Sequence, residues 1–197
     1  MKTQQLEELV LQSLEHEIGG VKIYEAALTC AMNSDLKEEW TKYLNETRTH
    51  VAVLEEVCAV MGIDPTQETP GRKVVRSIGR ALVQAMSFAK GAGDPEAAEL
   101  VACESVVLAE TKDHLDWELL GKCAEELSGA KGDTLKSAYE KIEQQEDEHL
   151  YHTKGWCREL WIESLGLKAV LPPPEERRNV KTAIDAARAE QDAEKGR

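Results

Sequence analysis

Residues 144–152, with the sequence QQEDEHLYH, place an acid and an imidazole on the apolar side of a helical pattern. From Leu135 to Leu160, apolar residues recur at alternating steps of three and four, which is typical of a helix that packs in a bundle. Glu146 and His149 occupy two positions of that series. Because a buried carboxylate or imidazole without a partner is costly, this helix needs partners from elsewhere in the core.

Three further segments, residues 6–31, 36–61 and 100–124, carry the same spacing of apolar residues. Each series is interrupted near its middle by polar residues: by Glu17, by Thr47 with His50, and by Glu110 with His114. Four such interruptions at one level are favourable if they face each other around cations, and Glu with His is the ligand set of carboxylate-bridged iron or manganese. His16 and His152 fall outside the apolar series, and we predict that they are solvated.

The connections between these segments predict the topology. Tight turns are indicated at residues 32–35 (MNSD) and 128–133 (SGAKGD). Residues 65–94 are a long connection with a shorter basic amphipathic helix from about Arg72 to Lys90. Two antiparallel helical hairpins joined by one long crossover are the ferritin-like arrangement. The sequence therefore predicts an all-α fold, a ferritin-like four-helix bundle over residues 1–168.

The last segment, residues 169–197, differs from the rest in composition. It contains three consecutive prolines, which form a stiff break. The residues that follow are charged and rich in alanine, with little apolar surface to bury. We predict a charged tail or a weak extra helix outside the core.

Composition limits the classes of function. The formal net charge of −13 argues against a nucleic-acid-binding protein, because phosphates would be repelled. No apolar run is long enough to cross a membrane, and the first residues lack the apolar core of a signal peptide, so we expect a cytoplasmic protein. The five cysteines form no CxxC pair, which predicts free thiols rather than disulfides or a sulfur-ligated metal.

Three motifs resemble the ferritin-like superfamily, near bacterioferritin and rubrerythrin in pattern. They are HEIGGVKIYEAAL at 16–28, HVAVLEEVCAVMG at 50–62, and the Glu-x-x-His motif EDEH at 146–149. The segment ETRTHVAVLEEVCAVMG at 46–62 is also similar to a bacterial stress-response family of ferritin-like proteins. The resemblance covers residues 5–165 and leaves out the tail.

The resemblance implies a set of metal ligands. The first-helix motif, in which a ligand Glu precedes a Tyr by seven residues, assigns Glu17, and the other two motifs assign His50, Glu146 and His149. Glu110 is our choice for the third helix, because Trp117 follows it at the same distance of seven. Tyr24 and Thr47 are expected beside the ligands.

The second helix departs from the family pattern. A Glu-x-x-His motif ending at His50 requires an acid three residues earlier, where this chain has Thr47. Three repairs are open: Glu46 turns inward, His114 or its neighbour Asp113 joins the ligands, or the site holds one metal or none. We favour a site that includes His114.

Two functions compete at this point. The first is a di-iron oxidoreductase, with manganese as the alternative metal, that reacts with O₂ or peroxide in a ferroxidase or peroxidase reaction; the spacing is that of two-metal sites generally. The second is a non-enzymatic helical bundle with a degenerate metal site that acts by binding partners. Iron storage in a shell ranks last. The resemblance also implies a homodimer or a higher homo-oligomer.

Overall fold

The computed structural model describes residues 2–196, and within them every regular element is a helix, which confirms the all-α class. The bounds are α1 Thr3–Cys30, α2 Ser34–Met61, α3 Pro70–Gly91, α4 Pro95–Glu126, α5 Gly129–Ser164, α6 Pro174–Arg177 and α7 Ala183–Gly196. No helix in the described chain is both long enough and apolar enough to span a membrane.

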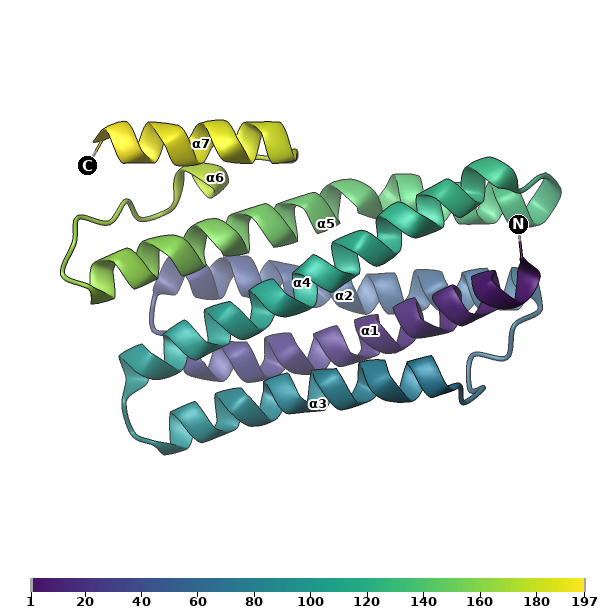
Figure 1. Cartoon of the computed structure of the whole chain (residues 1–197), viewed down its shortest axis with the longest axis horizontal. Coiled ribbons are helices and arrows are strands. Elements are labelled where there is room, and N and C mark those ends of the chain that lie inside the picture. The colour runs from purple at the N-terminus through teal and green to yellow at the C-terminus, as the bar shows by residue number, and fades with distance from the viewer. Residues whose placement is uncertain (1, 197) are drawn as a thin grey trace.

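Four long helices run side by side along the molecule (Figure 1). Helices α1 and α2 form one hairpin and α4 and α5 form another, with α1 packed on α4 and α2 packed on α5. Helix α3 belongs to the long connection between the hairpins and packs along α1 and α4. It spans Pro70–Gly91, close to the crossover helix that the sequence predicts.

Side-chain caps fix where the helices begin. The Asn33 side chain accepts hydrogen bonds from the first turn of α2, Thr69 does so for α3, and Asp94 for α4. Each satisfies backbone N–H groups that have no partner within the helix. The turn between α1 and α2 is also tied to α4, because the Glu99 carboxylate accepts hydrogen bonds from the backbone N–H groups of Met32 and Asn33.

Helix α5 begins at Gly129, six residues before the first apolar residue of its predicted series. The tight turn predicted within residues 128–133 is present but lies earlier, because residues 129–133 already belong to α5. Gly132 explains the difference: a Cβ on it would lie 2.6 Å from the Leu127 carbonyl oxygen, so glycine lets the first turn of α5 pack against the end of α4. Here glycine serves close packing and does not end a helix.

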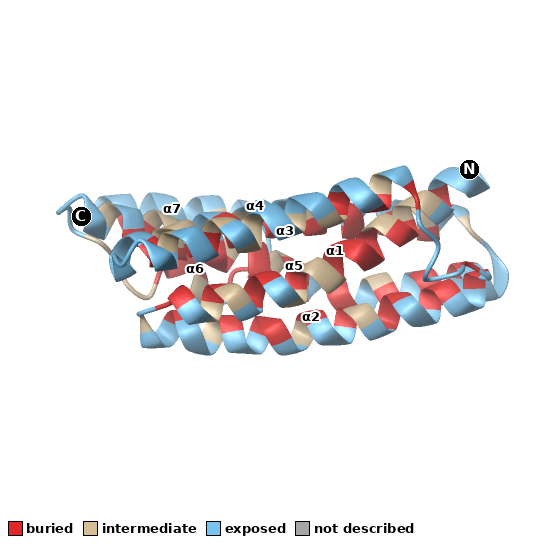
Figure 2. Ribbon diagram, turned by 90° about the horizontal axis from the view of Figure 1, so that it is seen from below, coloured by how far each residue is buried: buried red, intermediate tan, exposed pale blue. Residues whose placement is uncertain are grey.

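Buried residues line the facing sides of the long helices (Figure 2). They form two apolar clusters, one containing Tyr24, Trp40 and Trp156 and the other containing Leu54 and Trp117. Along each long helix, one cluster lies before the polar interruption and the other after it. The polar layer therefore separates two halves of the core.

The tail lies against α5, and α7 runs above it in Figure 1. Glu175 is buried and pairs with the Arg158 guanidinium at 2.7 and 3.0 Å. His152 is buried as well, with Nε2 at 3.0 Å from the Val180 carbonyl oxygen. His16 is buried and lies 3.0 Å from the Ala109 carbonyl oxygen. The prediction that His16 and His152 are solvated is therefore wrong, because the tail covers one and α4 the other.

Gly155→Ala should loosen the tail. A Cβ at this position would lie 2.6 Å from Glu175 Oε2 and 3.0 Å from Pro173 Cβ, so the tail must shift. We expect a loss of about 1–3 kcal/mol in the free energy of unfolding, measured by urea titration, and faster proteolysis within residues 169–197.

Gly19→Ala in α1 is the matched control, because no atom lies within 4 Å of the Cβ that it adds. It should gain up to about 1 kcal/mol from helix propensity. Equal proteolysis of the tail in both variants would contradict the packing described here.

Candidate metal centre

Five of the predicted ligands meet at mid-height of the long helices, and all five are buried. They form two groups in which ligand atoms lie within 4.8 Å of one another. One group is Glu17 of α1, His50 of α2 and Glu146 of α5. The other is Glu110 of α4 with Glu146 and His149 of α5. Glu146 belongs to both groups, so it lies between two candidate positions for a cation.

Both histidines turn Nδ1 toward the carboxylates. His50 Nδ1 lies 2.9 Å from Glu146 Oε1 and 3.4 Å from Glu17 Oε1. His149 Nδ1 lies 3.7 Å from Glu146 Oε1 and 3.6 Å from Glu110 Oε2. The two rings are stacked with centroids 5.7 Å apart. The centre thus has an approximate twofold arrangement, with one Glu and one His on each side of Glu146.

The atoms that face inward lack hydrogen-bond partners. These atoms are Oε2 of Glu17, Oε2 of Glu110, both carboxylate oxygens of Glu146, and Nδ1 of His50 and of His149. They make up six of the nine buried side-chain N and O atoms without a partner in the described part of the chain. Since buried polar groups are normally satisfied, such a concentration of oxygen and imidazole donors fits a site for iron or manganese.

The outer carboxylates are each held by an aromatic donor from the other hairpin. Tyr24 of α1 donates its hydroxyl to Glu110 Oε1 at 2.9 Å. Trp117 of α4 donates Nε1–H to Glu17 Oε1 at 2.8 Å. Tyr24 follows Glu17 by seven residues on α1, and Trp117 follows Glu110 by seven residues on α4. Each aromatic residue, however, donates to the Glu of the other helix, so the repeated spacing corresponds to a crossed pair of hydrogen bonds. One oxygen of each carboxylate is fixed by this hydrogen bond, and the other oxygen has no hydrogen-bond partner and could contact a cation.

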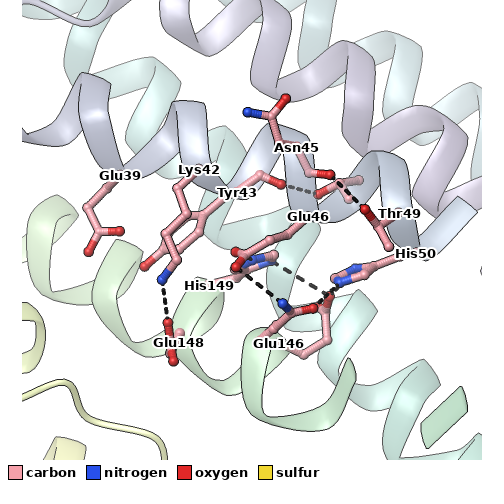
Figure 3. A network of polar contacts seen from close by, with 12 residues as sticks. Glu39, Lys42, Tyr43, Asn45, Glu46, Thr49, His50, Glu146, Glu148 and His149 are labelled. Carbon is pink, nitrogen blue, oxygen red and sulfur yellow. Dashed lines mark hydrogen bonds and ion pairs between the residues drawn. The ribbon is translucent and has the colours of Figure 1, made fainter. Parts of the chain in front are cut away.

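The histidines are oriented by a second crossed pair. Glu46 Oε2 of α2 lies 2.9 Å from His149 Nε2 of α5, and Gln145 Oε1 of α5 lies 2.9 Å from His50 Nε2 of α2. Gln145 also donates to Glu46 at 3.2 Å. Figure 3 shows Glu46 and His149 facing each other beside His50 and Glu146. A partner on the outer ring nitrogen fixes the ring and leaves Nδ1 free for a metal.

The remaining candidates take other positions. Thr47 is buried, but its hydroxyl donates to the Tyr43 carbonyl of its own helix at 2.9 Å and belongs to neither ligand group. His114 lies outside both groups, with Nε2 at 2.8 Å from Asp147 Oδ1. Glu46 contacts the outer side of a ligand histidine. Asp113 is buried with Oδ1 unpaired, although it is absent from both groups.

Two contacts were missed by reasoning on the sequence. Trp117 was used only for its spacing from Glu110, so its hydrogen bond to Glu17 was not foreseen, and Gln145 was not considered. A signal for Gln145 was present, because it lies four residues before His149 just as Glu46 lies four residues before His50. The signal becomes clear only when the helices are seen to cross-pair.

The crowded carboxylates hold protons at the centre. Burial alone would lower the pKa of His149, but the nearby carboxylates of Glu110, Glu46 and Glu146 raise it to about 9. Burial also opposes a charge on His50, yet Glu17 and Glu146 hold the pKa of His50 well above its ordinary value. Burial raises the pKa of Asp113 strongly, and the charges of Glu146, Glu17 and Glu110 add to the rise. The protonated imidazoles thus place positive charge among the carboxylates.

The metal-free protein should lose stability as the pH rises. The folded pKa of His149 exceeds its ordinary value of 6.5, so its contribution is complete below pH 6.5 and is lost toward pH 9. His50 acts in the same direction. The pKa of His16 is lowered, so it is already neutral in this window. We expect the free energy of unfolding to fall by on the order of 2 kcal/mol between pH 6.5 and 8.5, measured by urea titration with chelator.

His149→Gln is the control and should show a smaller fall, because the contribution of His149 is then removed. Stability that stays level or increases across this range in the wild-type chain would show that the histidines are not held protonated by the carboxylates.

Comparisons of the chain with protein-family models, with curated proteins and with solved structures give no match. The ferritin-like family therefore remains a prediction carried by the sequence motifs. The function must be argued from the contacts at the centre itself.

Proposed function

We propose that this chain is a ferritin-like protein that binds two metal ions at mid-core and acts as an oxidoreductase toward O₂ or peroxide. The observation that carries the proposal is the set of buried, unpaired donor atoms on Glu17, His50, Glu110, Glu146 and His149. These atoms come from four different helices. The hydrogen-bond partners of these side chains contact their outer atoms, so the inner atoms would be available to bind metal ions.

Each ion would have its own pair of residues and would share the middle one. Glu17 and His50 would hold one ion, Glu110 and His149 the other, and Glu146 would contact both. Asp113 adds a fourth carboxylate near the centre. Four ionised carboxylates would match two divalent cations, and Asp113, whose pKa is raised in the metal-free protein, would then supply the charge that Thr47 does not. Iron is the favoured metal and manganese the alternative, since both accept carboxylate and imidazole ligands.

When bound, iron would supply redox chemistry by cycling between ferrous and ferric states. The protein residues exclude bulk water, because all five ligands are almost fully buried. Tyr24 and Trp117 fix the outer carboxylates, and Glu46 and Gln145 fix the rings. Fixed ligands in a closed, buried centre favour a small co-substrate such as O₂ or peroxide over a bulky one.

A second function is favoured by Thr47 alone. Its hydroxyl bonds its own helix, so the position that the family pattern gives to an acid supplies no ligand. A chain with a degenerate site would be a non-enzymatic bundle in which the polar layer specifies packing. The inward, unpaired atoms count against this alternative, because a purely structural layer would satisfy them.

Glu146→Gln should abolish binding at both positions, since its carboxylate is shared by the two groups. We expect metal content to fall from about two ions per chain to less than half of the wild-type content, measured by plasma mass spectrometry on untagged protein reconstituted with ferrous iron or manganese.

Glu148→Gln is the matched control two residues away on the same helix. Glu148 is also buried, but it pairs with Lys42 at 2.6 Å and Lys181 at 2.7 Å and belongs to neither group. It should keep the wild-type metal content. Equal metal content in both variants, or no metal in the wild-type chain, would remove the proposed site.

The oxidoreductase activity is tested separately from binding. Ferrous iron added to the metal-free chain should be oxidised at least about tenfold faster than iron in buffer, with consumption of O₂ or peroxide; this corresponds to about 1.4 kcal/mol of barrier lowering. Glu146→Gln should remove the acceleration and Glu148→Gln should retain it. Metal binding without acceleration would favour the non-enzymatic alternative.

A further inference from the structure

A pocket of about 240 Å³ lies in the seam between α4 and α5, on the outer side of the metal centre. Its α4 wall contains His114, Trp117 and Glu118, and its α5 wall contains Tyr139, Glu143, Glu146, Asp147 and Tyr151. Thr182 and Ala183, at the start of α7, close one side. The pocket is thus bounded by three separate parts of the chain.

The inner wall of this pocket reaches the centre. Glu146 lines the pocket, is 1% exposed, and has no hydrogen-bond partner on either carboxylate oxygen. Trp117, which also lines the pocket, donates its Nε1–H to Glu17. The residue whose carboxylate belongs to both ligand groups is therefore also one of the residues that line this cavity.

The outer walls carry negative charge. Glu118 and Glu143 are exposed, and Asp147 is partly buried on the same side. His114 is the only basic side chain on the described pocket wall, and it is already paired with Asp147 at 2.8 Å. Asp185 in the first turn of α7 offsets the partial positive charge of that helix end. A wall of this charge concentrates cations and repels anions.

We propose that this pocket is the access route by which divalent cations reach the metal centre, and that Glu118, Glu143 and Asp147 attract them. The inference rests on the proposed metal site. An ion would pass from the two exposed side chains to Asp147 and then to Glu146, so acidic residues line the route from its mouth to the centre. His114, which we had favoured as a ligand, belongs to the wall of this route.

The route is tested by the rate of metal uptake. Cobalt(II) is mixed with the metal-free chain in a stopped-flow instrument, and its visible absorption reports binding. We expect uptake by Glu118→Gln/Glu143→Gln to be slower by about tenfold at low ionic strength, and uptake by Glu118→Lys/Glu143→Lys to be slower still. The final cobalt content should equal that of the wild-type chain, since neither residue belongs to a ligand group.

Glu38→Gln/Glu55→Gln is the control. It removes the same net charge from exposed positions on α2 that lie outside the pocket, and it should take up cobalt at nearly the wild-type rate. The difference between the two double variants should shrink in high salt, because screening weakens attraction between exposed charges.

The outcomes separate the two proposals. Equal uptake rates in the pocket and control variants, with cobalt bound by all, would overturn the route and leave the metal site standing. A reduced final cobalt content in the pocket variants would also overturn it, because these residues would then be ligands. A wild-type chain that binds no cobalt would overturn both the site and the route.

Discussion

The structure depends on how it accommodates carboxylates at mid-core. Glu17, Glu110, Glu146 and Asp113 are acidic side chains that lie close together and are nearly inaccessible to water. Such groups are tolerated only when protons, hydrogen bonds or cations compensate them. The observed hydrogen bonds satisfy one oxygen each of Glu17 and Glu110 and none of Glu146. Hydrogen bonds alone therefore leave the carboxylates incompletely compensated, and the deficit is concentrated where the four helices meet.

The hairpins depend on each other through this layer. Tyr24 and Trp117 exchange contacts between α1 and α4, while Glu46 and Gln145 exchange contacts between α2 and α5. In each pair, one hairpin positions a Glu or His side chain of the other. Neither hairpin can form a complete half of the centre alone. The seven-residue spacing from Glu to an aromatic residue, repeated in α1 and α4, therefore corresponds to hydrogen bonds between the two hairpins.

The sequence predicted the all-α class and the residues that meet at the centre, because helical spacing determines which face of a helix a residue occupies. It did not predict the direction in which a side chain near the edge of that face turns. His114 and Asp113 are adjacent in sequence, yet the first lines an outer pocket and the second is buried. His16 and His152 were misjudged because other segments cover them, and a single helix pattern carries no information about that coverage. The α4–α5 pocket also depends on the tail, whose placement was not predictable from its composition.

The separation of the apolar core into two clusters has a consequence for folding cooperativity. Each cluster contains parts of all four long helices, and the two are joined through a layer in which several polar atoms lack partners. The polar layer crosses the bundle at mid-length and stabilises it less than the apolar clusters do. Amide hydrogens in the two clusters can therefore exchange through separate local openings. A ligand that binds the layer would join the two clusters into a single cooperative unit, and its effect would extend to helix ends far from the atoms it contacts.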